Sequence, residues 1–284
     1  MHPRFAAFPE ALATRARAAR VTHDRIPVLL AHPDWRTPSP TVVWLHGRTV
    51  SKELDPGRYL RLIRAGMAVC AVDLPGHGER EGARWHEPSH TLDVVEQAVG
   101  EIDGIVRALA GVEDGAAFDL GRVALGGMSA GGMVTMRRLC EPHGFRAGVV
   151  EGASGLLSEL YFPRPGAQRK PWPVDHPRAR VEGLDPSRHL TGWRPLPFMS
   201  IHTTGDAVVA FETQREFVER LRAHYLVCGA DPDAPATRVE LVTFTDTGAP
   251  LEHAGFGRYA NEAKNAFVGF LAGALGAEET EGGV

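Results

Sequence analysis

The segment Gly127-Met128-Ser129-Ala130-Gly131 places a serine between two glycines in a G-x-S-x-G pattern. An apolar run at 123–126 precedes the pattern and predicts a strand, and the segment 133–140 after it can form a helix. A serine in a sharp strand-to-helix turn exposes its hydroxyl to substrate, and small residues beside it make room for the turn. The pattern therefore indicates that Ser129 is a nucleophile, although a glycine-rich chain can also contain it by chance.

Two later residues could activate this serine. A serine hydroxyl is a weak nucleophile, so it needs a histidine as base and a carboxylate that orients the histidine. Asp206 follows a predicted strand at 198–202, and His253 lies in a glycine-rich loop after a predicted strand at 238–244. The order serine, acid, histidine is the one that goes with this kind of turn. We therefore assign Asp206 as the acid and His253 as the base.

Each of these assignments has an alternative. Asp206 could cap a helix, because aspartate is common where a strand leads into one. His253 could be a histidine of a surface loop. Glu151 directly follows the predicted strand 147–150 and is the rival acid. The choice between Asp206 and Glu151 depends on which carboxylate lies beside His253.

Strands and helices alternate along most of the chain. Solid apolar runs predict buried strands, and such alternation predicts an α/β fold with a mostly parallel central sheet and helices on both faces. We expect one domain over residues 1–284, interrupted by a proline-rich insertion at about 155–197. The predicted strands are 25–31, 41–45, 67–72, 123–126, 147–150, 198–202 and 238–244. The predicted helices are 5–20, 56–65, 92–109, 133–140, 212–226 and 259–275.

The composition excludes several classes of function. A hydrophobic content of 43% supports a substantial core, and a net charge of −4 argues against nucleic acid as a partner. No apolar run has the length of a signal peptide or a membrane span, and the three cysteines are far apart, so we expect a cytoplasmic protein with no membrane partner. The histidines lack metal-ligand spacing, and we expect neither a metal nor a cofactor. The oligomeric state stays open, with a homodimer as one possibility.

The motifs together resemble the α/β-hydrolase superfamily. Within it, Leu45-His46-Gly47-Arg48 and the segment from Val72 to Arg80 resemble bacterial esterases of the dienelactone-hydrolase-like and prolyl-oligopeptidase-like groups. The resemblance implies an oxyanion hole formed by the backbone amides of Arg48 and Ala130. It also implies that His46, Gly47 and Met128 lie around the site, with His46 supporting the loops rather than transferring protons.

The side chain of Arg48 has two interpretations. A guanidinium at this position could pair with an acidic group of the substrate. It could instead face solvent or pair with an acidic neighbour, namely Glu53, Glu79 or Asp73. We expect Asp73 itself to hold the Gly76-His77-Gly78 turn by accepting backbone hydrogen bonds.

The resemblance also implies that the 155–197 insertion is a lid over the substrate pocket. Its residues Trp172 and Trp193 could line the pocket or could pack the insertion onto the sheet. We predict a serine hydrolase that cleaves small-molecule carboxylic esters with small to medium acyl groups through an acyl-enzyme. A thioesterase and an acyl-peptide hydrolase are the alternatives with the same three catalytic residues. A non-catalytic binding protein on the same scaffold is the alternative from another class.

Overall fold

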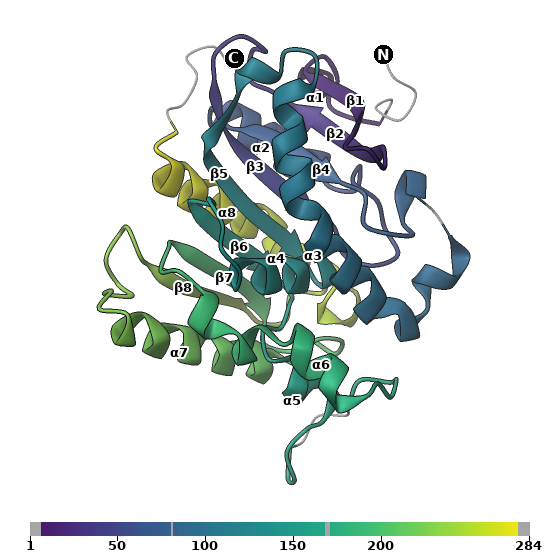
Figure 1. Ribbon diagram of the computed structural model, residues 1–284, viewed down its shortest axis with the longest axis vertical. Helices are drawn as coiled ribbons and strands as arrows, with labels where there is room; N and C mark the ends of the chain where they lie inside the picture. Colours follow the sequence, from purple (N-terminus) through teal and green to yellow (C-terminus); the bar gives the residue numbers. More distant parts are fainter. Residues whose placement is uncertain (1–6, 81, 168–170, 278–284) are drawn as a thin grey trace.

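The apolar runs of the sequence form the strands of one sheet. The computed structural model describes residues 7–80, 82–167 and 171–277, and within them the sheet has eight strands in the order β1-β2-β4-β3-β5-β6-β7-β8 (Figure 1). The strands are β1 Ala16–Val21, β2 Ile26–Ala31, β3 Ser39–Leu45, β4 Ala68–Val72, β5 Phe118–Met128, β6 Ala147–Glu151, β7 Phe198–Thr203 and β8 Val239–Phe244.

Six of these strands are parallel. The run from β4 through β3, β5, β6 and β7 to β8 pairs in parallel, whereas β1 and β2 form an antiparallel hairpin whose strand β2 is also antiparallel to β4. Every residue of β3, β4, β6 and β7 is buried, as expected where helices cover both faces. The predicted α/β fold with a mostly parallel sheet is confirmed.

Helices pack on the two faces of the sheet in separate groups. Helices α3, α4 and α7 contribute to one apolar cluster, and α1, α2 and α8 contribute to the other. Figure 1 shows α3 and α4 in front of the sheet and α8 behind it. The α-helices are α1 Glu10–Ala13, α2 Pro56–Arg64, α3 Thr91–Ala108, α4 Ala130–Leu139, α5 Leu157–Tyr161, α6 Arg178–Leu184, α7 Phe211–Val227 and α8 Ala260–Leu275. Short 3-10 helices lie at Gly78–Arg80, Ala83–His86, Pro88–His90, Leu109–Gly111, Gly115–Ala117, Pro186–Arg188, Leu190–Gly192, Pro250–Glu252 and Gly257–Tyr259.

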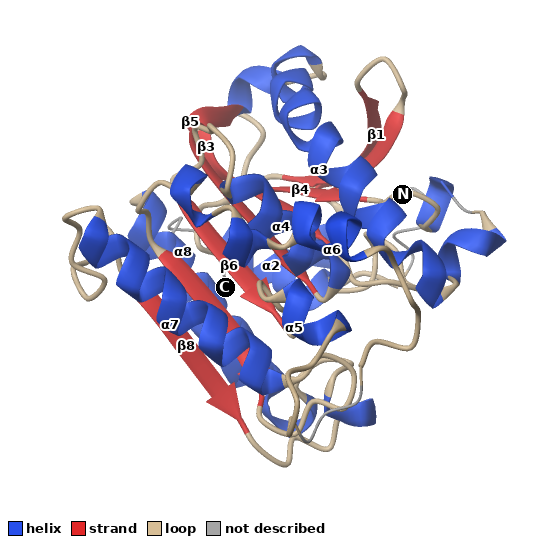
Figure 2. Ribbon diagram, turned by 60° about the horizontal axis from the view of Figure 1, so that its bottom comes forward, coloured by secondary structure: helices blue, strands red, loops and turns tan. Residues whose placement is uncertain are grey.

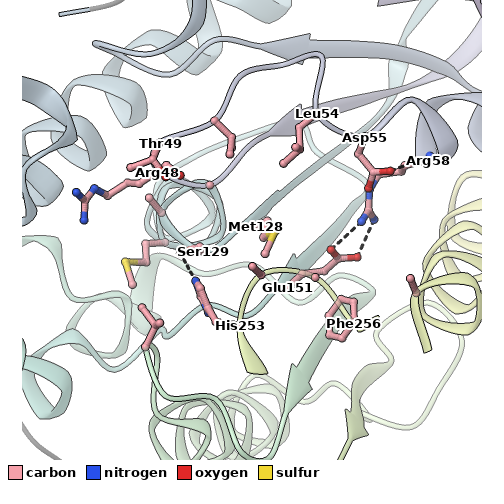
Figure 3. A pocket seen from close by; sticks show the side chains of 18 of the residues that line it. Arg48, Thr49, Leu54, Asp55, Arg58, Met128, Ser129, Glu151, His253 and Phe256 are labelled. Atoms are coloured by element: carbon pink, nitrogen blue, oxygen red, sulfur yellow. Dashed lines mark hydrogen bonds and ion pairs between the residues drawn. The ribbon is translucent and has the colours of Figure 1, made fainter. Parts of the chain in front are cut away.

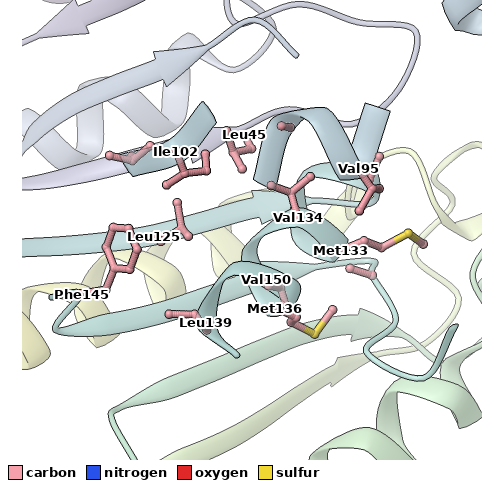
Figure 4. Packing of buried hydrophobic residues seen from close by; sticks show 14 of the residues in the cluster. Leu45, Val95, Ile102, Leu125, Met133, Val134, Met136, Leu139, Phe145 and Val150 are labelled. Atoms are coloured by element: carbon pink, nitrogen blue, oxygen red, sulfur yellow. The ribbon is translucent and has the colours of Figure 1, made fainter. Parts of the chain in front are cut away.

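The helical periodicity of apolar residues in the sequence produces the core beneath the serine turn. In α3 the buried residues Val95 and Ile102 recur at helical spacing and face Leu45 of β3 and Leu125 of β5 (Figure 4). Val134 of α4 packs into the same cluster. Because α4 begins right after Ser129, this packing fixes the helix that follows the serine.

The predicted helix at 5–20 is wrong. The structure has the four-residue α1 and then β1, which is paired along its whole length with β2 from Ala16 opposite Ala31 to Val21 opposite Ile26. Residues 5 and 6 of the prediction lie outside the described residues. Pairing with β2 satisfies the backbone of β1, while Arg17 and Arg20 reach outward to Asp114 and Glu79. An edge strand that carries arginines in this way has no apolar alternation from which to recognise it.

The insertion lies between β6 and β7 and contains α5 and α6. Figure 2 shows these two helices near the carboxyl end of β6. Trp193, one of its two tryptophans, is buried against Phe198 and Phe217, and its indole N–H donates to the Tyr225 hydroxyl at 3.0 Å. A pocket role for Trp193 is therefore wrong, and the residue joins the insertion to the core.

None of the helices in the part of the chain that the structure describes is both long and apolar enough to cross a membrane.

Candidate active site

Ser129 occupies a strained turn between β5 and α4. Its backbone has φ of 51° and ψ of −117°, and its amide donates to the carbonyl of Glu151 at 2.8 Å. A Cβ atom at Gly127 would lie 2.4 Å from the backbone of Gly131, and one at Gly131 would lie 2.3 Å from the Leu45 carbonyl oxygen. Only glycine fits at both positions, so the two glycines are required by close backbone packing around the serine.

The structure brings Ser129, His253 and Asp206 together from three separate loops. The Nε2 atom of His253 lies 3.0 Å from Ser129 Oγ (Figure 3). The Nδ1 atom of the same ring lies 2.7 Å from Asp206 Oδ2. Ser129 follows β5, Asp206 follows β7 and His253 follows β8. Because these strands are parallel, their carboxyl ends meet at one edge of the sheet, and the three loops leave that same edge. The result is a continuous hydrogen-bonded chain from hydroxyl to imidazole to carboxylate.

Asp206 is held as a carboxylate by several donors. Its Oδ1 atom accepts hydrogen bonds from the amides of Val208 and Val209 at 2.8 Å each. Burial alone would raise the pKa of this carboxyl, but the neighbouring His202 and His253 outweigh it and hold the pKa below its ordinary value. The charge and orientation of Asp206 are thus set by its surroundings.

His202 contributes to this environment and was missed by the sequence reasoning. It is fully buried at the end of β7, where Nε2 donates to the Val209 carbonyl at 2.9 Å and lies 3.4 Å from Asp206 Oδ2. In the sequence, His202 is only the polar residue at the end of the predicted strand 198–202. The one feature that could have identified it is its position four residues before Asp206.

Glu151 does not contact the histidine. Its carboxylate makes a bidentate pair with Arg58, with Oε1 at 2.7 Å from Nη1 and Oε2 at 2.8 Å from Nη2 (Figure 3). Arg58 also donates to Asp55 at 3.0 Å, and Asp55 pairs with Lys264 at 2.9 Å. Burial disfavours the Arg58 cation, but Glu151 and Asp55 outweigh it and raise the pKa of Arg58. Asp206, and not the rival Glu151, is therefore the carboxylate beside His253.

The two residues predicted to supply an oxyanion hole belong to backbone segments that flank Ser129. Ala130 is the first residue of α4, so its N–H has no acceptor within the helix. Arg48 follows Gly47, and a Cβ at Gly47 would be 3.5 Å from the Ser129 Cβ, which places this loop against the serine. The N-terminal end of a helix also favours negative charge. An oxyanion hole formed by the amides of Arg48 and Ala130 stays a prediction.

Buried histidines and Asp73 support the loop that carries Arg48. His46 Nδ1 donates to the Gly47 carbonyl at 2.5 Å, and its Nε2 accepts from the Leu74 amide at 3.1 Å. Burial lowers the pKa of His46 to about 4, so the ring is neutral near pH 7. Asp73 accepts from the amide of Glu79 at 2.9 Å and thereby holds the turn, as predicted.

Of the alternatives for the Arg48 side chain, the pairing with Glu53, Glu79 or Asp73 is wrong. Lys52 takes that place, with its ammonium 2.6 Å from Asp73, 3.0 Å from Glu53 and 2.8 Å from Glu79. The Arg48 side chain instead donates to the carbonyl of His86. Its guanidinium is half-buried rather than turned into solvent.

A cavity of about 520 Å³ opens beside Ser129, within the range of sites that bind small molecules. Trp172 of the insertion lines it and Trp193 does not. The residues from the sequence analysis that line this cavity are Gly47, Arg48, Met128, Ser129, Ala130, Glu151, Trp172 and His253. Among the described residues no three His, Cys, Asp or Glu side chains are grouped as metal ligands would be.

The sequence that forms this fold and this site matches a known protein family. Residues 42–262 match the model of a family described as the alpha/beta hydrolase family. The chain belongs to the alpha/beta hydrolase family. The matched range includes both backbone loops at the site and the serine, aspartate and histidine.

Two curated relatives of this alpha/beta hydrolase carry names of esterases. The chain is 28% identical over 196 residues to the "Putative esterase YitV" of Bacillus subtilis, covering 66% of this chain and 76% of that protein. It is 26% identical over 221 residues to the "Esterase YjfP" of Escherichia coli, covering 73% of this chain and 87% of that protein.

The same fold is also found in a peptidase. A solved structure of a puromycin-hydrolyzing peptidase of Mycobacterium tuberculosis matches with a TM-score of 0.68 and 20% identity, over 95% of this chain and 41% of that chain. At this level of identity the likeness concerns the fold alone. The fold is therefore compatible with ester and peptide substrates, and the site must be used to choose between them.

Proposed function

We propose that this alpha/beta hydrolase is a serine esterase that cleaves carboxylic esters with small to medium acyl groups. The observation that carries the proposal is the hydrogen-bonded chain from Ser129 Oγ through His253 to Asp206, which ends in a cavity of about 520 Å³. The names of the two curated relatives support an ester as the substrate.

The geometry supports an acyl-enzyme mechanism. Ser129 Oγ attacks the ester carbonyl carbon while His253 Nε2 takes the hydroxyl proton, and the amides of Ala130 and Arg48 stabilise the negative charge on the carbonyl oxygen. When the tetrahedral intermediate collapses, the C–O bond to the alcohol breaks and His253 gives its proton to the departing oxygen. Water then attacks the acyl-serine, His253 takes a proton from it, and the acid leaves as Ser129 regains its hydrogen.

Asp206 has a supporting electrostatic role in this mechanism. Its carboxylate accepts from Nδ1 of His253, which leaves Nε2 free to take the serine proton. It also stabilises the imidazolium that forms in each half of the reaction. His202 and the amides of Val208 and Val209 act on catalysis only through Asp206, as positioning groups.

The test is a series of p-nitrophenyl esters from acetyl to dodecanoyl, with the wild type and the Ser129→Ala, Asp206→Asn and Glu151→Gln variants. Ser129→Ala and Asp206→Asn should each lower kcat/KM by roughly a thousandfold or more. Ser187→Ala, on the far part of the insertion, is the matched serine control. Acetyl and butyryl esters should be the preferred substrates.

Several outcomes would contradict the proposal. Full activity of Ser129→Ala would exclude the mechanism. An active Asp206→Asn beside an inactive Glu151→Gln would reassign the acid. A wild type that a fluorophosphonate labels at Ser129 but that turns over no ester would favour a thioester or an acylated peptide as substrate. Faster hydrolysis of dodecanoyl than of butyryl esters would overturn the expected acyl size.

A further inference from the structure

The cavity beside Ser129 is lined by an arginine that makes no ion pair with any residue that the structure describes. Arg48 lines this cavity and also a second one of about 630 Å³ that shares Trp172 and Val208 with it. Its one hydrogen bond to a described residue goes to the neutral carbonyl of His86, and it makes no ion pair within the described residues. Its Nε atom is buried and has no hydrogen-bond partner there.

The surroundings of Arg48 do not balance this charge. Burial lowers the pKa of the Arg48 guanidinium, and the charge of Glu87 opposes that effect only in part. Burial raises the pKa of Tyr161, so its phenol is neutral near pH 7. His77, whose pKa is lowered by burial, is also neutral near pH 7. Arg48 therefore stands in the cavity wall as a cation without a counterion at contact distance.

Two further residues that line the same cavity each have a buried polar atom without a partner among the described residues. These atoms are the hydroxyl of Thr91, at the start of α3, and the indole N–H of Trp172, from the insertion. The hydroxyl of Tyr161, whose ring centre is 5.8 Å from that of Trp172, is also unpaired. Buried polar groups are normally hydrogen-bonded, so a group of them around one binding cavity indicates a bound polar group.

We propose that Arg48, Thr91 and Trp172 form a subsite for a free carboxylate on the substrate. The inference rests on the proposed esterase function and narrows its substrate class to esters that carry a second, ionised acid group. A carboxylate accepts from a guanidinium in a bidentate manner and can accept from a hydroxyl and an indole N–H at the same time. The unpaired atoms are shielded from solvent by their neighbours, so the proposal requires a side-chain rotation at the cavity wall that brings them to the ligand.

The substrate would be a monoester of a small dicarboxylic acid, or a small hydroxy acid that is acylated on its hydroxyl and keeps a free carboxylate. The opposite end of the cavity does not offer the same chemistry, because Arg58 is already paired with Glu151 and Asp55. The negative group is thus expected on the side of α3 and the insertion, as Figure 3 shows Arg48 and Arg58 on opposite sides of Ser129.

The test compares matched ester pairs that differ only in the terminal charge. Monoethyl glutarate against ethyl valerate places the carboxylate in the acyl part, and 4-acetoxybutanoate against butyl acetate places it in the alcohol part. For at least one pair, the wild type should favour the anionic ester by about tenfold or more in kcat/KM, through a lower KM. Ethanol or acetate release gives the rates.

The variants distinguish loss of the carboxylate subsite from loss of the folded structure. Arg48→Gln should abolish the preference for the anionic ester, and Arg48→Lys should retain part of it. Trp172→Phe and Thr91→Val, which remove one polar group and keep the shape, should each reduce the preference severalfold. Arg215→Gln on α7, which removes an exposed positive charge that lines neither cavity, is the matched control and should leave the preference intact. Circular dichroism and thermal unfolding verify that each variant folds.

Binding without turnover provides an independent readout. In isothermal titration calorimetry, monoethyl glutarate or 4-acetoxybutanoate should bind the Ser129→Ala protein at least tenfold more tightly than its neutral counterpart, and the difference should vanish when Arg48→Gln is added. An equal preference for charged and neutral esters, or a preference that survives Arg48→Gln, would overturn the subsite but leave the esterase proposal standing. Loss of all ester turnover in the wild type would count against the esterase proposal, and calorimetry would still decide on the subsite.

Discussion

Two arginines at opposite ends of one cavity show how differently a buried cation can be used. Arg58 has a bidentate bond to Glu151, a bond to Asp55, and the rings of Trp44 and Phe267 at 4.3 and 4.4 Å from its guanidinium carbon. Arg48 has a backbone carbonyl as its one described hydrogen-bond partner and no ion pair among the described residues. A buried charge that is fully paired serves the structure, whereas one that is left unpaired beside a cavity is available to a ligand.

The largest expected effect on stability comes from removing the carboxylate that pairs with Arg58. Glu151→Leu should lower the free energy of unfolding by about 3–5 kcal/mol, because it leaves Arg58 buried without its bidentate partner. Urea unfolding followed by circular dichroism measures this. The double variant Arg58→Met with Glu151→Leu should regain most of the loss, since it removes both charges together. A single variant as stable as the wild type would show that Arg58 does not depend on Glu151.

A second prediction concerns the pH dependence of stability. His46 supports the loop that carries Arg48, because its ring donates to the Gly47 carbonyl. The folded-state pKa of His46 is about 4 against 6.5 for the unfolded chain, so between these values only the unfolded chain binds the proton. The contribution of His46 to stability is therefore complete above pH 6.5 and is lost as pH falls toward 4, by roughly 3 kcal/mol at most.

The nearby Asp73 does not remove this effect. It lies 3.7 Å from His46 Nε2, but Lys52 already pairs with it. Urea unfolding at a series of pH values should show the decline, and His46→Gln should flatten it while lowering stability at pH 7. An unchanged slope in that variant would assign the acid sensitivity to other groups.

The smallest effect is expected from Arg48 itself. Arg48→Met should change the free energy of unfolding by less than about 1 kcal/mol, because the side chain loses one bond to a carbonyl and an unbalanced charge at the same time. The contrast with Glu151→Leu is the measurement that matters, and the two should be compared under identical conditions. A loss of about 3 kcal/mol for Arg48→Met would make the two arginines alike and would remove the basis of their different roles.

The sequence predicted those parts of the molecule whose signal is local. Apolar runs located seven strands of the sheet, and the glycines around Ser129 located its turn, because each pattern lies within about ten residues. The strand β1 was predicted as a helix, since it is stabilised by its pairing with β2 rather than by its own apolar pattern.

Contacts between distant residues were beyond such reasoning. Arg58 and Glu151 are 93 positions apart, and Trp193 finds its hydrogen-bond partner Tyr225 32 positions later. Nothing in the local sequence distinguishes Trp193, which is part of the core, from Trp172, which lines the cavity. The family resemblance singled out Arg48 through its backbone amide, but the surroundings of its side chain became visible only in the structure.

The wide spacing of the site along the chain has a consequence for its synthesis. Ser129 and His253 are 124 positions apart, and they meet only once β8 has paired with β7 and the loop after it has crossed the sheet edge. Parallel strands joined by long connections pair slowly, since each pairing closes a long loop. When the ribosome has released the serine turn, it has not yet produced the histidine that bonds to Ser129. In the proposed mechanism, the nascent chain therefore lacks its base for most of translation and gains it only near the end of folding.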